Sequence, residues 1–95
     1  MRQAAETAGI KVEKLDKDQL ESLKVLSWPI WTKEVSTFDW FYEAQEQCYF
    51  LEGEGSVKTP AGEISFGKGD FVTFPKGLRC TWYVRKPVRK HYRFG

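Results

Sequence analysis

The fourteen-residue stretch 69–82, GDFVTFPKGLRCTW, predicts two β-strands joined by a tight turn. In its first part, residues 71–74, side chains of alternate parity face opposite sides of a sheet, as in a half-buried strand. Pro75 then fixes the backbone φ angle, and Gly77 can adopt φ values that are unfavourable for other residues, so a turn follows. A turn this tight holds the next residues at a defined position. Cys80, at the start of the second strand, is therefore a candidate site residue.

The chain on both sides of this stretch also has the pattern of short strands separated by turn residues. Gly53 and Gly55 predict a bend in the longest of these strands, as barrel corners require. We predict strands at 10–14, 31–36, 38–43, 46–57, 63–66, 71–74, 80–85 and 88–94. About eight short strands with frequent turns predict an all-β fold, a small antiparallel barrel or double sheet.

One short helix is predicted near the N-terminus. Asp16 can accept a hydrogen bond from the first helical turn while Gln19 reaches back, which is a capping box. Leu15 and Leu20 occupy the positions of a hydrophobic staple. We expect this helix to run to about Lys24 and to plug one end of the barrel.

Length and composition predict a single domain over residues 10–95. Residues 1–9 are either a frayed, disordered start or the remnant of a longer segment, and the sequence leaves both alternatives open. The chain has 41% hydrophobic and 16% aromatic residues, so a core rich in rings is expected. No apolar run approaches the roughly 20 residues that a membrane helix needs. The two cysteines form no metal or disulfide pattern, which favours reduced thiols and an intracellular location. That location would be the cytoplasm, or an organelle such as a plastid if a transit segment has been removed.

Charge is distributed unevenly along the chain. Residues 1–70 hold all 13 acidic and 8 basic residues, whereas residues 71–95 hold 7 basic residues and no acid. Such segregation can indicate an anionic partner such as nucleic acid. We favour a second explanation, pairing of these basic side chains with acidic neighbours in one sheet, because a pI near 8.6 is low for a nucleic-acid-binding domain. The basic residues concerned are Arg79, Arg85, Lys86, Arg89, Lys90 and Arg93.

The stretch 69–82 resembles the second conserved motif of the cupin superfamily, whose fold is the RmlC-like jelly roll. The resemblance implies a histidine metal ligand at position 80, where this chain has Cys80. Glu46 resembles the glutamate of the first cupin motif, and Trp40 and Tyr42 stand where two histidines are expected. The resemblance therefore implies a cupin-type barrel from which most of the usual metal ligands are missing.

Four longer matches are more specific. The segments WPIW at 28–31, FDW at 38–40, CYFLEG at 48–53 and FPKGLRCTW at 74–82 resemble small single-domain proteins grouped with the cupin domain of (S)-ureidoglycine aminohydrolase. This resemblance implies a homodimer, because family members often pair through exposed strands. It implies little about activity, since many small members have none assigned.

We expect no metal and no cofactor. A divalent site needs three or four ligands from His, Cys, Asp or Glu. Glu46, Cys80 and His91 could form a three-ligand set, but no spacing requires it. A nucleophilic Cys80 would need a base, and His91 is the available candidate. A buried, unreactive thiol is the favoured alternative for Cys80, and Cys48 is predicted to be a core residue.

Glu46 shares its parity with inward-facing residues, and two readings stay open for it. It can be a surface carboxylate at a strand start, or a general acid or base in an aromatic pocket. We predict a pocket lined by Trp40, Tyr42, Glu46, Phe50, Cys80 and Trp82, with Phe74 nearby; the candidate catalytic residues are Glu46, Tyr42 and His91. The predicted function is binding of a small molecule without metal. The alternatives are a hydrolase or isomerase that uses Glu46, and binding of anionic polymers by the basic C-terminal strands.

Overall fold

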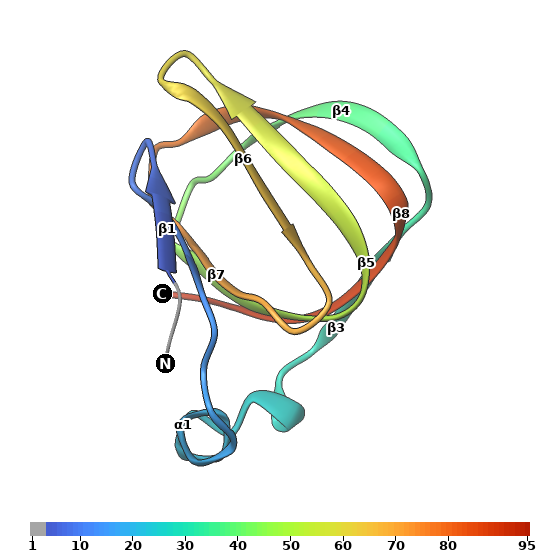
Figure 1. Ribbon diagram of the computed structural model, residues 1–95. Coiled ribbons are helices and arrows are strands. Elements are labelled where there is room, and N and C mark those ends of the chain that lie inside the picture. Colours follow the sequence, from blue (N-terminus) through green and yellow to red (C-terminus); the bar gives the residue numbers. More distant parts are fainter. Residues whose placement is uncertain (1–3) are drawn as a thin grey trace.

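The computed structural model describes residues 4–95 and shows antiparallel strands curved around a main core (Figure 1). The hydrogen-bonded path runs β1-β2-β7-β5-β8-β3, with β4 added on β8 and β6 on β5. The strands are β1 (Ala4–Thr7), β2 (Ile10–Glu13), β3 (Ile30–Lys33), β4 (Ser36–Phe41), β5 (Glu46–Thr59), β6 (Gly62–Gly67), β7 (Phe71–Phe74) and β8 (Arg79–Phe94). This confirms the predicted all-β, jelly-roll-like fold. Over residues 4–95 the sheet is not closed into a continuous hydrogen-bonded barrel.

The last two predicted strands, 80–85 and 88–94, form a single strand in the structure, β8. Pro87 suggested a break, because proline cannot donate to a sheet ladder. The partner strand β5 absorbs this irregularity through register shifts between Phe50 and Gly55. At Gly53 (φ +97°) a Cβ atom would overlap the carbonyl oxygen of Pro87, so glycine allows the two strands to cross closely.

The predicted N-terminal helix is present as α1 (Lys17–Ser22), with the Asp16–Gln19 capping box. It ends before the expected Lys24, which adopts a left-handed conformation and leads into the 3-10 helix η1 (Val25–Ser27). Leucines of this region pack with Trp28 and Phe71 in a second, smaller core. The helix therefore lies beside the sheet rather than plugging the barrel (Figure 1). Part of the predicted frayed segment, Ala4–Thr7, pairs with β2 as strand β1.

The main core lies on the inner face of the curved sheet. It includes Cys48, Phe50 and Val57 of β5, Val72 and Phe74 of β7, and Cys80, Trp82, Val84 and Val88 of β8, mostly at the two-residue spacing of a strand. The register sets Glu46 opposite Phe74 on β7 and Phe94 on β8, and it sets Phe50 opposite Lys90. Glu46, Phe50 and Lys90 therefore face the same interior. Between residues 4 and 95, no helix has the length and apolarity to cross a membrane.

Candidate functional site

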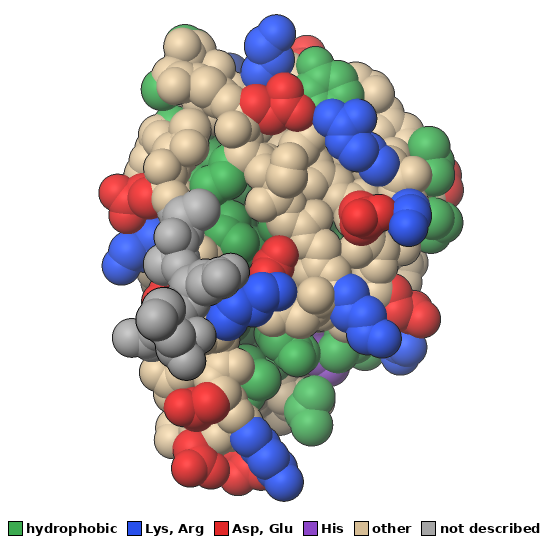
Figure 2. Space-filling view, viewed as in Figure 1, with side chains coloured by type: hydrophobic (Ala, Val, Ile, Leu, Met, Phe, Trp, Pro, Cys, Tyr) green, Lys and Arg blue, Asp and Glu red, His purple; other side chains and the backbone are tan. Residues whose placement is uncertain are grey.

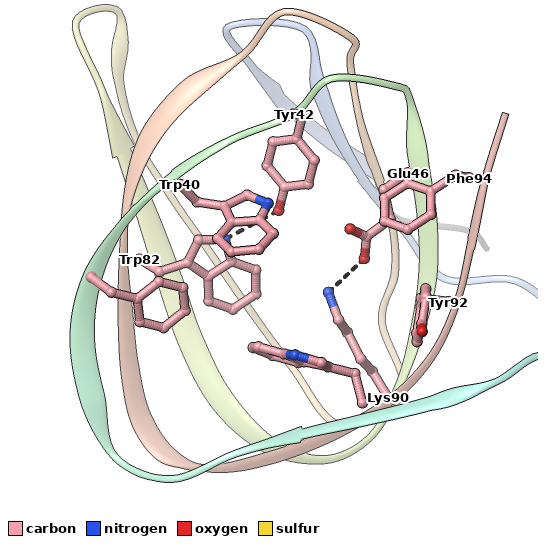
Figure 3. A pocket seen from close by; sticks show the side chains of 9 residues that line it. Trp40, Tyr42, Glu46, Trp82, Lys90, Tyr92 and Phe94 are labelled. Atoms are coloured by element: carbon pink, nitrogen blue, oxygen red, sulfur yellow. Dashed lines mark hydrogen bonds and ion pairs between the residues drawn. The ribbon is translucent and has the colours of Figure 1, made fainter.

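A cavity of about 220 Å³ opens from the inner face of the sheet and is lined mainly by aromatic rings (Figure 3). Its lining also includes one carboxylate, one ammonium and two tyrosines. The lining residues are Trp31, Phe38, Trp40, Tyr42, Glu46, Trp82, Lys90, Tyr92 and Phe94. An apolar wall with a few convergent polar groups is the usual composition of a small-molecule site.

An ion pair lies inside this cavity. Nζ of Lys90 donates to Oε2 of Glu46 across 2.6 Å, and each residue exposes only 4% of its surface. Glu46 starts β5, and Lys90 reaches it from β8. Within residues 4–95 the Glu46 carboxylate accepts no other hydrogen bond, although a carboxylate can accept several. The pair therefore keeps acceptor capacity for a ligand.

Four rings surround the Lys90 ammonium. Its Nζ atom lies 4.9 Å from the ring centroid of Trp31 and 5.1 Å from that of Trp82. The centroids of Phe50 and Phe74 are at 5.6 and 5.7 Å. Aromatic faces attract cations at these distances, most strongly where water is excluded. The rings and Glu46 together hold a positive charge at a fixed point of the cavity.

Tyr42 presents its hydroxyl to the same space. Nε1 of Trp82 donates to the Tyr42 oxygen at 3.1 Å, and the Tyr42 ring stacks on Phe74 with centroids 4.8 Å apart. Burial raises the pKa of Tyr42 well above its usual range, and the negative charge of Glu46 adds to the effect. Tyr42 is therefore a neutral phenol that can donate its own proton in a hydrogen bond.

The turn that follows β7 fixes the position of Tyr42. The Tyr42 backbone N–H donates to the carbonyl of Leu78 at 2.9 Å, and its carbonyl accepts from the N–H of Gly77 at 2.7 Å. Gly77 has φ +87°, the left-handed conformation expected of this turn. The turn of the 69–82 motif thus positions a cavity residue from a distant part of the sequence.

Four of the six predicted pocket residues line this cavity: Trp40, Tyr42, Glu46 and Trp82. Phe50 is fully buried behind Lys90 instead. Cys80 lies outside the lining, in register with Trp40 and beside a separate, more open hollow on the surface. Neither Phe50 nor Cys80 therefore meets a ligand bound in the cavity.

His91, predicted to assist Glu46, lies on the opposite face of β8. Its Nδ1 atom is 2.9 Å from the carbonyl oxygen of Trp28, in the second core. Because adjacent strand residues point to opposite faces, the inward position of Lys90 sends His91 outward. The structure thus separates His91 from the cavity, and its predicted catalytic role does not fit this position.

The two thiols are free and buried. Burial raises the pKa of Cys48 to about 12, and Sγ of Cys48 donates to the carbonyl of Val72. Burial, with the negative charge of Asp39, raises the pKa of Cys80 to about 11. Both sulfurs are protonated near neutral pH, so neither has the character of a nucleophile.

The residues present do not fit the metal site of metal-binding cupins. No group of three His, Cys, Asp or Glu side chains comes together within residues 4–95. Glu46 is paired with Lys90, whereas Cys80 and His91 lie elsewhere. In this site the positive charge next to the glutamate is supplied by the Lys90 ammonium.

Lys90, Trp31, Tyr92 and Phe94 were not among the predicted pocket residues. Lys90 was grouped with the basic residues of the C-terminal strands, on charge alone. In the continuous strand β8, Lys90 is an even number of residues from the inward-facing Trp82, but the break expected at Pro87 hid this relation in the sequence.

Three of the other six basic residues of segment 71–95, namely Arg85, Lys86 and Arg93, have acidic or polar partners. Lys86 pairs with Glu54, and Arg85 pairs with Glu63 on β6. Figure 2 shows acidic and basic side chains interspersed over the visible face. This supports the explanation that the charge asymmetry reflects pairing between neighbouring strands.

The chain is similar to a known protein family and to several solved structures. The family model described as EutQ-like cupin domain matches residues 20–92. A DUF861 family protein from Thermotoga maritima is 54% identical, with a TM-score of 0.88 over 90% of this chain and 99% of that one. The EutQ protein of Clostridium difficile is 22% identical, with a TM-score of 0.65 over 90% of this chain and 68% of that one.

A putative ethanolamine utilization protein EutQ from Salmonella typhimurium has the same fold, with 23% identity, a TM-score of 0.64 and coverage of 90% of this chain and 68% of that one. A search of curated proteins gave no significant match. The resemblance to the ureidoglycine aminohydrolase group stays a prediction. The cupin assignment is confirmed, and this chain belongs to the EutQ-like cupin domain family.

Proposed function

We propose that this protein binds a small molecule with a flat, largely apolar body and one polar group, held in the aromatic cavity. The observation that carries the proposal is the buried Glu46–Lys90 pair in the cavity wall. Replacing a buried ion pair by apolar residues is often neutral or stabilising, so stability alone gives little reason to keep one. A role in recognising a ligand gives such a reason.

The size of the cavity limits the ligand. A volume of about 220 Å³ is below the range usual for drug-sized ligands. It corresponds to roughly seven water volumes of about 30 Å³ each. A single ring with one short polar substituent fits this space. Its ring would contact the tryptophans, and its polar group would meet Glu46, Lys90 and the Tyr42 hydroxyl.

The proposal is tested with ring fragments carrying one amide, hydroxyl, carbonyl or carboxylate group, screened by ligand-observed NMR. The wild type is compared with the double variant Glu46→Met/Lys90→Met, which keeps side-chain volume and removes both charges. The control is Glu54→Met/Lys86→Met, which removes an exposed pair from the same two strands. Binding by the wild type and the control but not by the cavity variant supports the proposal. Equal binding by all three proteins, or none by any, rejects it.

A second candidate is an enzyme, a hydrolase or isomerase, in which Glu46 transfers a proton. The observation that favours it is a carboxylate beside a neutral phenol in a partly closed cavity (Figure 3). Once a binding fragment is known, turnover of related esters, amides or keto compounds by the wild type and by Glu46→Gln tests this candidate. Equal conversion rates for the two proteins would reject it.

A homodimer is part of the proposal. Trp40 and Phe94 at the cavity rim expose 47% and 56% of their surfaces, and the neighbouring Phe41 exposes 40%. Exposed aromatic groups of this kind often mark contact surfaces. Sedimentation of the wild type and of Phe41→Ser would test it. The predicted intracellular location stays a prediction, consistent with two free thiols.

A further inference from the structure

We propose that Lys90 forms a protonated imine with a small aldehyde or ketone that enters the aromatic cavity. The inference rests on the proposed function, because it concerns the same cavity. It adds a chemical class of ligand, carbonyl compounds, and a covalent role for a residue that the sequence grouped with surface charges.

The cavity lining contains one primary amine, that of Lys90. The sequence has ten lysines, and within residues 4–95 Lys90 is the only one that is buried. Lysine amines form Schiff bases with carbonyl groups, and a buried lysine is the usual form of such a residue. The Glu46 carboxylate, 2.6 Å away, is placed to accept the proton that the ammonium must lose first.

The surroundings of Nζ suit the product as well as the starting ammonium. A protonated imine retains one positive charge on the same nitrogen. The four rings around that nitrogen and the Glu46 counter-ion therefore stabilise both states. No buried charge is gained or lost between the start and the end of the reaction, so neither state is left with an unpaired ion.

Imine formation at Lys90 releases one water molecule. Glu46 takes one proton from the Lys90 ammonium, and the freed nitrogen lone pair attacks the carbonyl carbon, forming the C–N bond as the C–O π bond breaks. The nitrogen passes a proton to that oxygen, giving a neutral carbinolamine. Glu46 returns its proton to the hydroxyl, which leaves as water while the nitrogen lone pair forms the C=N bond. The products are an iminium ion, a carboxylate and one water molecule, with no oxidant or reductant consumed.

Tyr42 is placed to assist. Its hydroxyl, the Glu46 carboxylate and the Lys90 ammonium point toward a common space in Figure 3. Tyr42 accepts a hydrogen bond from Trp82 and keeps its own proton to donate. A hydrogen bond from it to the carbonyl oxygen would stabilise negative charge that develops during the attack.

The test uses benzaldehyde, whose single ring suits the lining, with borohydride to reduce any imine to a stable secondary amine. The whole protein is treated with one equivalent of benzaldehyde and analysed by intact mass and peptide mapping. Lys86 is the internal control, because it lies on the same strand but is exposed. We expect modification of Lys90 to exceed that of Lys86 by at least about tenfold, because the cavity holds the aldehyde beside the amine. Labelling of Lys86 to the same extent would overturn the proposal.

The variant Lys90→Arg and the ligand benzyl alcohol separate imine formation from binding. Lys90→Arg keeps the cation and cannot form an imine, so its labelling should fall to the level of the surface lysines; unchanged labelling would reject the proposal. Benzyl alcohol has the same ring but no carbonyl group, and its binding is followed by tryptophan fluorescence. If benzyl alcohol binds and Lys90 is not modified, the covalent role is rejected and the binding function stands. If neither molecule binds, both are rejected.

Discussion

Nζ of Lys90 lies 2.6 Å from Oε2 of Glu46, inside a ring of aromatic side chains and almost out of contact with solvent. Taking two charges out of water carries a large desolvation penalty, which the attraction between them only partly offsets. Such a pair is weak evidence for stability, and its position in a cavity wall makes a binding role the better explanation.

Removing one partner of this pair should destabilise the protein strongly. We expect Lys90→Met and Glu46→Met each to lower the free energy of unfolding by about 3–5 kcal/mol, because each leaves a buried charge without its partner. The double variant should be closer to the wild type than either single variant. Urea unfolding of the wild type, the two single variants and the double variant measures these changes in the free energy of unfolding.

Those four proteins form a double-mutant cycle, and the exposed Glu54–Lys86 pair on the same strands is its control. Its side chains are 54% and 70% exposed, so we expect a coupling below about 1 kcal/mol. Similar coupling energies for the buried and the exposed pair would show that the buried environment of Lys90 is misassigned.

Alkaline pH should destabilise the protein through its buried thiols. Burial raises the pKa of Cys48 from 9.0 to about 12, so the folded state keeps a proton that the unfolded state has lost. Stability is then unaffected below about pH 9 and falls as pH rises toward 12, by about 1.4 kcal/mol per pH unit for this group. Urea unfolding between pH 8 and about pH 11 should show a shallower decline for Cys48→Ala. Parallel slopes for the two proteins would contradict this account.

The crossing of β5 and β8 should depend on Gly53. Gly53→Ala would place a methyl group against the carbonyl oxygen of Pro87 and force a left-handed backbone, so we expect a loss of more than about 3 kcal/mol. Gly77 has a similar backbone angle, φ +87°, but in Gly77→Ala no atom would lie within 4 Å of the new methyl group. It should lose only about 1–2 kcal/mol. Equal losses in thermal or urea unfolding would show that the close approach at Pro87 is unimportant.

Nucleic acid should bind poorly despite the basic C-terminal strands. Arg85 and Lys86 already pair with Glu63 and Glu54. We therefore expect no retardation of a single-stranded oligonucleotide by the wild type in low salt. Glu54→Gln/Glu63→Gln, which frees both cations, serves as the comparison. Tight, salt-dependent binding by the wild type would instead support an anionic partner.

The sequence predicted the strands well, because the alternation of side chains and the turn residues are local signals. It also predicted the inward parity of Glu46 and the capping box at Asp16, at the N-terminus of α1, because both depend on residues close in sequence. It missed the continuity of β8, since Pro87 is a local break signal while the compensating bend lies in the distant strand β5. The end of α1 was misplaced because the left-handed turn at Lys24 has no glycine to mark it.

The candidate site was predictable only in part. Parity alone places Trp40, Tyr42 and Trp82 toward one interior, and the structure brings them together around Glu46. The position of Lys90 was not predicted, because the break expected at Pro87 hid its parity relation to Trp82. The same break hid the outward parity of His91, whereas Cys80 shares the parity of Trp82 but does not reach the cavity, whose end a sequence does not show. Which side chains from distant strands meet in the cavity depends on the twist and register of the whole sheet.

The four indole N–H signals in a two-dimensional NMR spectrum test the central claim most directly. Trp31, Trp40 and Trp82 line the cavity, whereas Trp28 lies in the second core and serves as an internal reference. On titration with a ring fragment that binds, we predict that the signals of the three cavity tryptophans shift together and saturate with one dissociation constant, while that of Trp28 stays in place. A shift of Trp28 alone, or no shift at any of the four under saturating fragment, would contradict a binding site at the Glu46–Lys90 pair.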